Sequence, residues 1–360
     1  MLEEFVIRLS NINSFSHNLK GIEAVAALLE KEIMRLKPDH FERISLKNGP
    51  ALFATKRQRA KKQIYLGGHF DTVHQAHWDC VKKGDRLYGP GVLDMKGGLA
   101  ILLNSLKEFE KSEESQKLGW RLFLNPDEEL GSPFSAPLIA KKARGCNAAL
   151  LFEPALPNHH LVCQRRGSVN FLCKTKGKAA HVGRNLEMGE CAITKLAHFI
   201  VGVEKLNRQT IAACVGTVTG GHAANVVADQ ASCSLNLRFD KEFPEKALKK
   251  LASSYEVELQ QLSFRPPKPF DKKTKELFLS LKRCAEKLGF PLDWEKTGGV
   301  CDGNETHHAK VPTIDTLGGE GDGIHTREEF LIIPSLKKKS AITTAFLQQL
   351  ATGEYHAPCR

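Results

Sequence analysis

Two histidines and several carboxylates stand in short, glycine-flanked segments, where they could bind metal ions and transfer protons. The five candidate ligands lie in GGHFDT, GPGVLDMKGG, NPDEELGS, LLFEP and GDGIHT, and are His69, Asp94, Glu129, Glu153 and His325. Imidazole nitrogens combined with carboxylate oxygens suit a pair of divalent ions, most naturally zinc. Glu128, beside Glu129, is then available to accept and return a proton. This composition is typical of a two-metal hydrolase.

Each of these residues also has a structural explanation when it is taken alone. Asp94 could cap the helix that begins at MKGG, and the NPDEELGS carboxylates could be solvated turn residues. Three features favour a metal centre instead. Asp71 lies two residues after His69, on the same side of a strand, where it could fix the imidazole tautomer. Glu153 ends an apolar run, where an unpaired charge is costly. The consecutive carboxylates of residues 127–129 would repel one another without a cation.

The elements that must position these residues alternate between strands and helices. QIYLGGHF (63–70), WRLFLNPDEE (120–129) and AALLFEP (148–154) are typical of strands that end at candidate residues. Residues 2–36 and 95–109 have helical periodicity, and VPTIDTLGG (311–319) precedes the loop of His325. The alternation predicts an α/β fold with a mainly parallel sheet and helices on both faces. Sites in such sheets form at the carboxyl ends of the strands, so we expect one shared site.

The pattern changes between residues 165 and 270. GSVNFLCKTKGKAAH is typical of two short strands and a turn, and further segments complete a βαββαβ-like order. This order predicts a small α+β domain, residues 165–270, inserted into a catalytic domain formed by residues 1–164 and 271–360. PPKPF (266–270) has the composition of a return linker.

Composition and charge limit the class of protein and its partners. The 360 residues carry a formal net charge of +11, but the lysines are scattered and no aromatic residues are interleaved with them. We therefore expect no nucleic-acid partner. The ten cysteines form no CxxC pair, which favours reduced thiols. No apolar signal segment and no run of eighteen apolar residues is present, so we expect a soluble, cytoplasmic protein with no membrane partner.

The motifs resemble those of the zinc aminoacylase/carboxypeptidase family, which includes acetylornithine deacetylase, succinyl-diaminopimelate desuccinylase and the bacterial glutamate carboxypeptidases. HFDTV, YGPGVLDMKGG, DEELGS and FEP resemble its core signatures, in order and spacing. GKAAHVGRNLEMGECAI, GGHAANVVAD and NLRF are similar to its lid domain, and GGVCDGN and IHTREEF to its C-terminal part. The resemblance spans essentially the whole chain and implies a di-zinc exopeptidase-like fold. YGPGVLDMKGG, KAAHVG and the RPP that begins at Arg265 look most like the glutamate carboxypeptidase branch.

The resemblance implies a role for each candidate ligand. His69 and Glu153 would bind one zinc ion, Glu129 and His325 would bind the other, and Asp94 would bridge them. Co²⁺ or Mn²⁺ could take the place of zinc, because affinity order and availability compete.

The resemblance also implies roles for residues that do not bind the metals. Glu128 would be the general base, and Asp71 would orient His69. The lid would contact the scissile carbonyl and the substrate carboxylate through His181, Asn225 and Arg238. Arg265 stands where a further arginine for the substrate carboxylate is expected. Family members commonly form homodimers through the inserted domain, and His181 would then reach the partner subunit.

These expectations describe a hydrolase of amide bonds in C-terminal or N-acylated amino acids, with a small or short-peptide substrate that has a free carboxylate. Glutamate carboxypeptidase activity is the preferred hypothesis. An N-acyl amino acid deacylase of the acetylornithine type would use the same ligands, and a non-catalytic metal-binding relative is a third alternative. One departure from the family pattern is HQAHWDC, which follows DTV without the usual proline or glycine. We therefore expect a different pocket rim.

Overall fold

The computed structural model describes residues 2–156 and 158–353. The chain divides into two compact units. The first comprises Met1–Gln164, Phe270–Thr297 and Cys301–Arg360, and the second comprises Arg165–Pro269 and Gly298–Val300.

The first unit is built on a six-stranded sheet that is mainly parallel, as the sequence predicted. The strands are β1 (His40–Leu46), β2 (Gly49–Lys56), β6 (Leu118–Asn125), β3 (Lys62–His69), β7 (Ala148–Leu151) and β14 (Thr313–Ile314), in that spatial order. The four strands from β6 to β14 run parallel. β1 and β2 form an antiparallel hairpin at one edge, which the sequence analysis missed.

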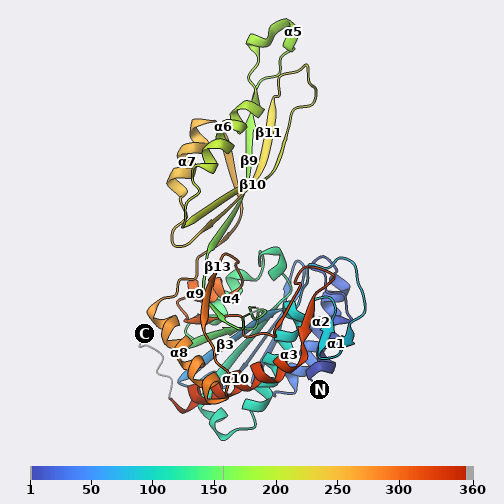
Figure 1. The fold of residues 1–360 in the computed structure, drawn as a ribbon, viewed down its shortest axis with the longest axis vertical. Helices are drawn as coiled ribbons and strands as arrows, with labels where there is room; N and C mark the ends of the chain where they lie inside the picture. Colours follow the sequence, from blue (N-terminus) through green and yellow to red (C-terminus); the bar gives the residue numbers. More distant parts are fainter. Residues whose placement is uncertain (1, 157, 354–360) are drawn as a thin grey trace. The chain divides into compact units, whose positions relative to one another are not determined.

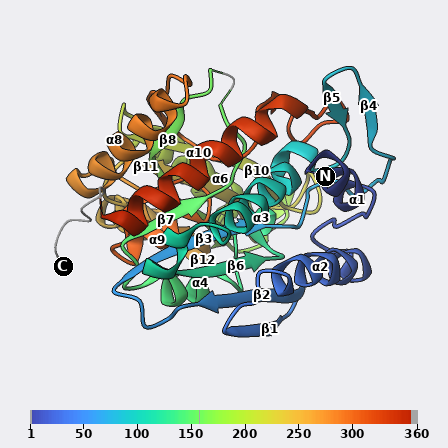
Figure 2. The same ribbon diagram turned by 90° about the horizontal axis from the view of Figure 1, so that it is seen from below.

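Apolar layers cover both faces of this sheet because its strands alternate their side chains. Ile64, Leu66 and Leu122 belong to a large core shared with α1 (Leu2–Ser10), α2 (Leu19–Met34), α3 (Gly97–Phe109), α8 (Lys272–Lys287) and α10 (Ile333–Thr352). Tyr65 and Phe123 point to the opposite face, toward α4 (Ala136–Ala143), near α9 (Gly303–His308). Figure 2 shows α3 and α10 side by side. Among the described residues, no helix is long and apolar enough to cross a membrane.

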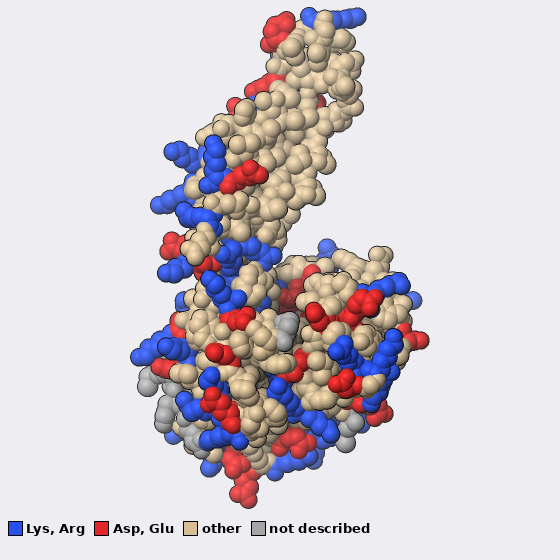
Figure 3. All heavy atoms as spheres, viewed as in Figure 1, with Lys and Arg blue, Asp and Glu red and all other residues tan. Residues whose placement is uncertain are grey.

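Smaller elements complete the first unit. The opening stretch forms two helices rather than one, because Asn18 accepts a hydrogen bond from the Gly21 amide and begins α2 anew. A small sheet contains β15 (Gly321–Asp322), β16 (Phe330–Ile332), β5 (Arg86–Tyr88) and β4 (Val81–Lys83), and β8 (Leu161–Arg165) pairs with β13 (Trp294–Thr297). Short turns of helix occur at η1 (Val92–Lys96), η2 (Glu113–Lys117) and η3 (Glu128–Leu130). On the face drawn in Figure 3, basic and acidic side chains of this unit are interleaved.

The second unit is an antiparallel sheet with helices on one face. Its strands are β10 (Ile211–Gly220), β11 (Gln230–Phe239), β9 (Gly167–Lys176) and β12 (Val257–Arg265), in that spatial order. The helices α6 (Ala192–Glu204) and α7 (Glu245–Ser254) pack on its apolar face, and α5 (Val182–Asn185) and η4 (Leu186–Met188) lie in the loop after β9. The chain order is therefore βαββαβ. GSVNFLCKTK is one continuous strand, so the prediction of two short strands there was wrong.

Lys339 is a charged residue inside the core of the first unit. It lies in α10, is 1% exposed, and its ammonium group has no hydrogen-bond partner among the described residues. Burial lowers the pKa of this ammonium group from 10.5 to about 8. The folded protein therefore binds this proton less tightly than the unfolded chain does, and the protonated form destabilises the fold.

Lys339→Met should stabilise the protein at pH 7 by up to ~3 kcal/mol, because the pKa difference corresponds to that free energy. The destabilisation by Lys339 is complete below pH 8 and fades as the pH rises from 8 to 10.5. The gain measured by urea unfolding should therefore be much smaller at pH 10 than at pH 7. Lys337→Met, at an exposed neighbouring position, is the control. An equal gain at both pH values would contradict this account.

Candidate metal centre

Three neighbouring parallel strands bring the candidate residues to one edge of the sheet. β3 ends at His69, β6 ends at Asn125 just before η3, and β7 ends two residues before Glu153. β3 lies between β6 and β7, so these three carboxyl ends are adjacent. Asp94 is supplied by η1, which precedes α3, and His325 by the loop between β15 and β16.

The five candidate ligands form two groups that share Asp94. His69 Nε2 lies 3.2 Å from Asp94 Oδ1 and 3.7 Å from Glu153 Oε2. His325 Nε2 lies 3.4 Å from Asp94 Oδ2 and 3.4 Å from Glu129 Oε2. The donor atoms of His69, Asp94 and Glu129 all lie within 4.8 Å of one another. Ligand atoms at 2.0–2.1 Å from a tetrahedral zinc ion are separated by about 3.3 Å. The imidazole–carboxylate separations of 3.2–3.7 Å are therefore similar to those between ligands of one ion, and the three donors that meet within 4.8 Å, from His69, Asp94 and Glu129, include members of both groups.

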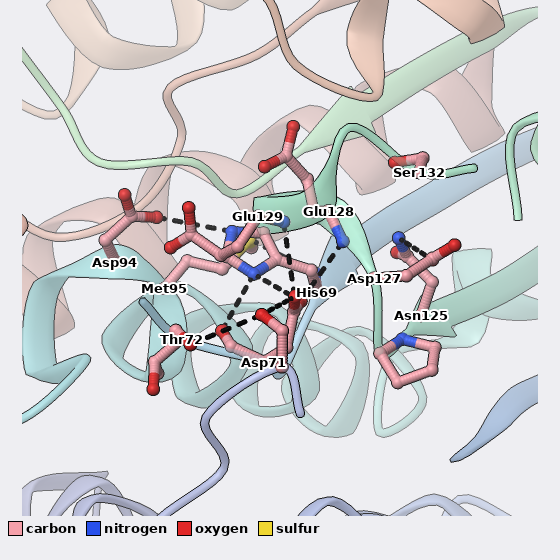
Figure 4. Close-up of polar contacts among 12 residues, drawn as sticks. His69, Asp71, Thr72, Asp94, Met95, Asn125, Asp127, Glu128, Glu129 and Ser132 are labelled. Carbon is pink, nitrogen blue, oxygen red and sulfur yellow. Dashed lines mark hydrogen bonds and ion pairs between the residues drawn. The ribbon is translucent and has the colours of Figure 1, made fainter. Parts of the chain in front are cut away.

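Asp71 fixes the orientation of His69. His69 Nδ1 lies 3.1 Å from the backbone oxygen of Asp71 and 3.3 Å from its Oδ1 (Figure 4). Both partners are acceptors, so Nδ1 carries a proton, and in the neutral ring the lone pair on Nε2 would be available to a cation bound beside Asp94 and Glu153.

Asp71 also holds the turn that carries the other carboxylates. Its side chain is fully buried and accepts hydrogen bonds from the backbone amides of Glu128 and Glu129, each at 3.2 Å. The hydroxyl of Ser16 donates a further hydrogen bond at 2.8 Å. One carboxylate thus connects His69 to η3.

The electrostatic environment of the two histidines is strongly negative. Burial lowers the pKa of His69, but hydrogen bonds to Asp71, Asp94 and Glu153 raise it well above its usual value overall. Hydrogen bonds to Asp94 and Glu129 raise the pKa of His325 to about 10. Burial raises the pKa of Glu129. Burial also acts to raise the pKa of Asp94, but the imidazoles of His325 and His69 outweigh it and hold the pKa of that carboxyl below its usual range. Such an environment favours the binding of cations.

Asp127 does not face this site, although the sequence analysis grouped it with Glu128 and Glu129. Its carboxylate accepts hydrogen bonds from the backbone amides of Phe134 and Ser135 at 2.9 and 3.1 Å, and from the Ser135 hydroxyl at 2.5 Å. Figure 4 shows the side chains of Asp127 and Glu128 pointing in different directions. Asp127 therefore needs no cation shared with Glu128 and Glu129, contrary to the expectation from the three consecutive carboxylates.

Glu329 is a buried carboxylate beside the site that sequence reasoning missed. It is 0% exposed and accepts hydrogen bonds from the backbone amides of Gly91, Leu93 and Asp94. The signal in the sequence was a glutamate directly before the apolar segment FLII, close to His325. Its significance depends on contacts with residues more than 230 positions away, which no local pattern indicates.

The four candidate residues of the second unit form two groups. His181 and Asn225 lie in neighbouring loops. His181 forms an isolated antiparallel β-bridge with Val226, and the Val182 amide donates a hydrogen bond to the backbone oxygen of Asn225 at 3.1 Å. Arg238 and Arg265 both pair with Ser168 in the sheet, so the three residues form one row across β11, β9 and β12. Arg238 Nη1 is buried and has no hydrogen-bond partner among the described residues.

These two groups lie at opposite ends of the second unit's sheet. The arginine row is at the start of β9, whereas His181 follows its end (Figure 1). Ten residues of strand at about 3.3 Å each separate the two groups by roughly 30 Å. Within this unit they therefore cannot contact the same small molecule.

Comparison with known sequences identifies related proteins. The sequence profile described as peptidase family M20/M25/M40 matches residues 65–349. Carboxypeptidase G2 of Pseudomonas sp. (strain RS-16) is 25% identical over 373 residues, covering 96% of this chain and 88% of that protein. Succinyl-diaminopimelate desuccinylase of Orientia tsutsugamushi (strain Ikeda) is 23% identical over 335 residues, covering 84% of each chain.

Comparison with solved structures finds the same fold. Aminopeptidase PepT from Bacillus cereus ATCC 10987 has a TM-score of 0.79 at 20% identity, over 97% of this chain and 98% of that chain. The Bacillus subtilis YXEP protein, described as a dinuclear metal-binding peptidase from the M20 family, has a TM-score of 0.70 at 14% identity, over 99% and 98%. These similarities confirm the predicted fold class.

Proposed function

The chain belongs to peptidase family M20/M25/M40 and is a hydrolase of peptide or amide bonds, and we propose that it is a two-metal carboxypeptidase that releases C-terminal glutamate. The observation that carries the proposal is the pair of ligand groups joined by the two oxygens of Asp94. One ion would be bound by His69, Asp94 and Glu153, and the other by Asp94, Glu129 and His325.

Zinc is the metal that we propose, with Co²⁺ or Mn²⁺ as alternatives. The ligand set mixes imidazole and carboxylate, and the separations of the donor atoms are close to those around a tetrahedral ion. Two such ions would polarise the scissile carbonyl and lower the pKa of a water molecule.

Glu128 is the residue to which we assign proton transfer. It belongs to neither ligand group, and its backbone is held by Asp71 beside the ligand Glu129. A carboxylate so placed can accept a proton from the attacking water and return it to the leaving amine. Asp71 would act through His69, by keeping the imidazole in the tautomer that presents Nε2.

Arg238 and Arg265 are the residues that we assign to the substrate carboxylate. Burial, together with the positive charge of the neighbouring Arg265, lowers the pKa of Arg238. A carboxylate would relieve the repulsion and provide acceptors for Arg238 Nη1, which has none among the described residues. The formal net charge of +11 also favours the binding of anionic substrates.

A homodimer formed through the second unit would let both groups of that unit act on one substrate. His181 and Asn225 lie roughly 30 Å from the arginine row within the unit, by the rise of about 3.3 Å per strand residue. We therefore propose that the arginines and the His181 group reach one substrate from different subunits. His181 of the partner subunit would then contact the scissile carbonyl.

The alternative function is deacylation of an N-acyl amino acid of the acetylornithine or succinyl-diaminopimelate type. The similarity to the Orientia desuccinylase over 84% of the chain favours this alternative, whereas the longer match to carboxypeptidase G2 favours the first. A non-catalytic relative is the least favoured, because all five ligand candidates and Glu128 are in place.

The zinc-loaded protein should release glutamate from glutamyl-terminated peptides and N-acyl-glutamates faster than it releases any other amino acid. The measurement is amine release across a panel that also contains N-acetylornithine and N-succinyl-diaminopimelate, with chelator-treated protein as the control. Preferred release of ornithine or diaminopimelate would establish the deacylase instead. Metal binding without turnover on any substrate would favour the non-catalytic relative.

Glu128→Gln should lower kcat by about 100-fold to 10,000-fold, the range associated with loss of a general acid–base group. The amide keeps the size of the side chain but cannot accept a proton, so the number of bound metal ions should not change. Stopped-assay kinetics and metal analysis of the same preparation test both statements. Glu113→Gln, at an exposed position in η2, is the matched control. A Glu128→Gln variant within tenfold of wild-type kcat would refute the assignment.

Mixing two inactive variants should restore activity if His181 acts in the partner subunit. In a hybrid of His181→Ala and Glu128→Gln chains, one of the two sites has both an intact Glu128 and an intact His181 from the other chain. Random pairing makes half of the dimers hybrids, so about one quarter of wild-type activity should return. No recovery, with hybrid dimers verified by mass, would show that His181 acts within its own chain.

A further inference from the structure

Glu329 is the point where three loops of the candidate metal centre meet. It is four residues after His325, directly before β16, and is 0% exposed. Its Oε1 accepts hydrogen bonds from the amides of Leu93 at 2.9 Å and Asp94 at 3.0 Å. Its Oε2 accepts one from the Gly91 amide at 3.0 Å and lies 2.8 Å from His74 Nε2.

These four contacts use the full acceptor capacity of a carboxylate. Each oxygen offers about two lone pairs, and each has two partners here. Converging backbone amides of this kind form an anion-binding nest in which the chain follows a strongly curved path. Gly91 supplies the curvature, with a φ of +70°, and a Cβ atom there would lie 2.5 Å from Thr72 Cγ2. The loop that presents Asp94 is therefore wrapped around the Glu329 carboxylate.

His74 connects a second loop to the same carboxylate. Since a carboxylate only accepts, the His74 nitrogen that faces it, Nε2, is the donor. The ring packs edge-on against Trp78, with centroids 4.9 Å apart. His74 belongs to HQAHWDC, the segment where this chain departs from the family pattern, and this segment continues from His69 and Asp71. Glu329 thus joins the chain after His69, the Asp94 loop and the His325 loop.

We propose that Glu329 is a positioning residue for the metal centre, which sets the backbone at Asp94 so that its two oxygens face two different imidazoles. The inference rests on the proposed two-metal function. The amide of Asp94 is itself one of the donors, so a shift of Glu329 moves the residue that both ligand groups share. His325 lies on the same short loop as Glu329, and its contact with Asp94 Oδ2 depends on the same anchor.

Glu329→Gln isolates this role, because it keeps the shape of the side chain and removes one acceptor oxygen. Whichever way the amide turns, an NH₂ group faces either Leu93 and Asp94 or Gly91, and at least one backbone amide loses its acceptor. Glu328→Gln is the matched control, since it changes the same charge at the exposed neighbouring position.

The experiment titrates Zn²⁺ against a competing chelator dye and records the visible absorption spectrum of the Co²⁺-loaded protein. Wild type and Glu328→Gln should bind two ions and give the same spectrum. Glu329→Gln should bind both ions at least tenfold more weakly, and its Co²⁺ bands should shift because the shared carboxylate is displaced. Circular dichroism on the same samples reports folding. A purely structural role would lower the melting temperature and leave the affinity and the spectrum of the folded protein unchanged.

A second variant keeps the test decisive if Glu329→Gln does not fold. His74→Phe preserves an aromatic ring against Trp78 and removes only one of the four donors. It should weaken metal binding by a smaller factor and still alter the Co²⁺ spectrum. Wild-type affinity and spectrum in whichever of these variants folds would overturn the proposal. A wild-type protein that fails to bind two ions would instead refute the two-metal function, so the two failures are distinguishable.

Discussion

Buried negative charge is the constraint around which the edge of the sheet is built. Asp71, Asp127 and Glu329 are all 0% exposed, and a carboxylate removed from water without donors would be costly. Each accepts hydrogen bonds from backbone amides of a neighbouring loop, so the need for donors ties the loops together. Asp94 and Glu129 face imidazoles instead. Asp71, Asp127 and Glu329, which accept from backbone amides, thus form the framework, and Asp94 and Glu129, which face His325, belong to the candidate metal centre.

The convergence of the candidate ligands followed from local signals in the sequence. Short apolar runs that end in a charged residue indicate strand ends, and parallel strands place those ends at one edge. His69 and Glu153 are both located in this way, at the ends of the adjacent strands β3 and β7. The alternation of strands and helices was equally visible, because each face of β3 contributes to a separate apolar layer. The meeting of these residues at one edge of the sheet could be predicted because each segment carries its own pattern.

Other parts of the structure depend on contacts that no segment reveals alone. β1 is an edge strand with exposed or half-buried residues, so its sequence HFERISL lacks an apolar run. The direction of the Asp127 side chain is decided by the backbone amides of residues 134–135, which directly precede α4. Glu329 accepts hydrogen bonds from a loop more than 230 residues earlier in the chain. A sequence shows where the carboxylates are, but only the fold shows which backbone amides donate hydrogen bonds to them.

The length of the second unit's strands determines the distance between the arginine row and His181. If both groups serve one substrate in a homodimer, this length also determines the distance between the two active sites. Side chains alternate with a period of two, so removing one residue from β9 would turn its apolar face outward. Removing two residues would preserve the alternation of buried and exposed side chains and shorten the strand by about 7 Å. Length changes tolerated during divergence should therefore accumulate in the loops, while the strands keep their count of residues.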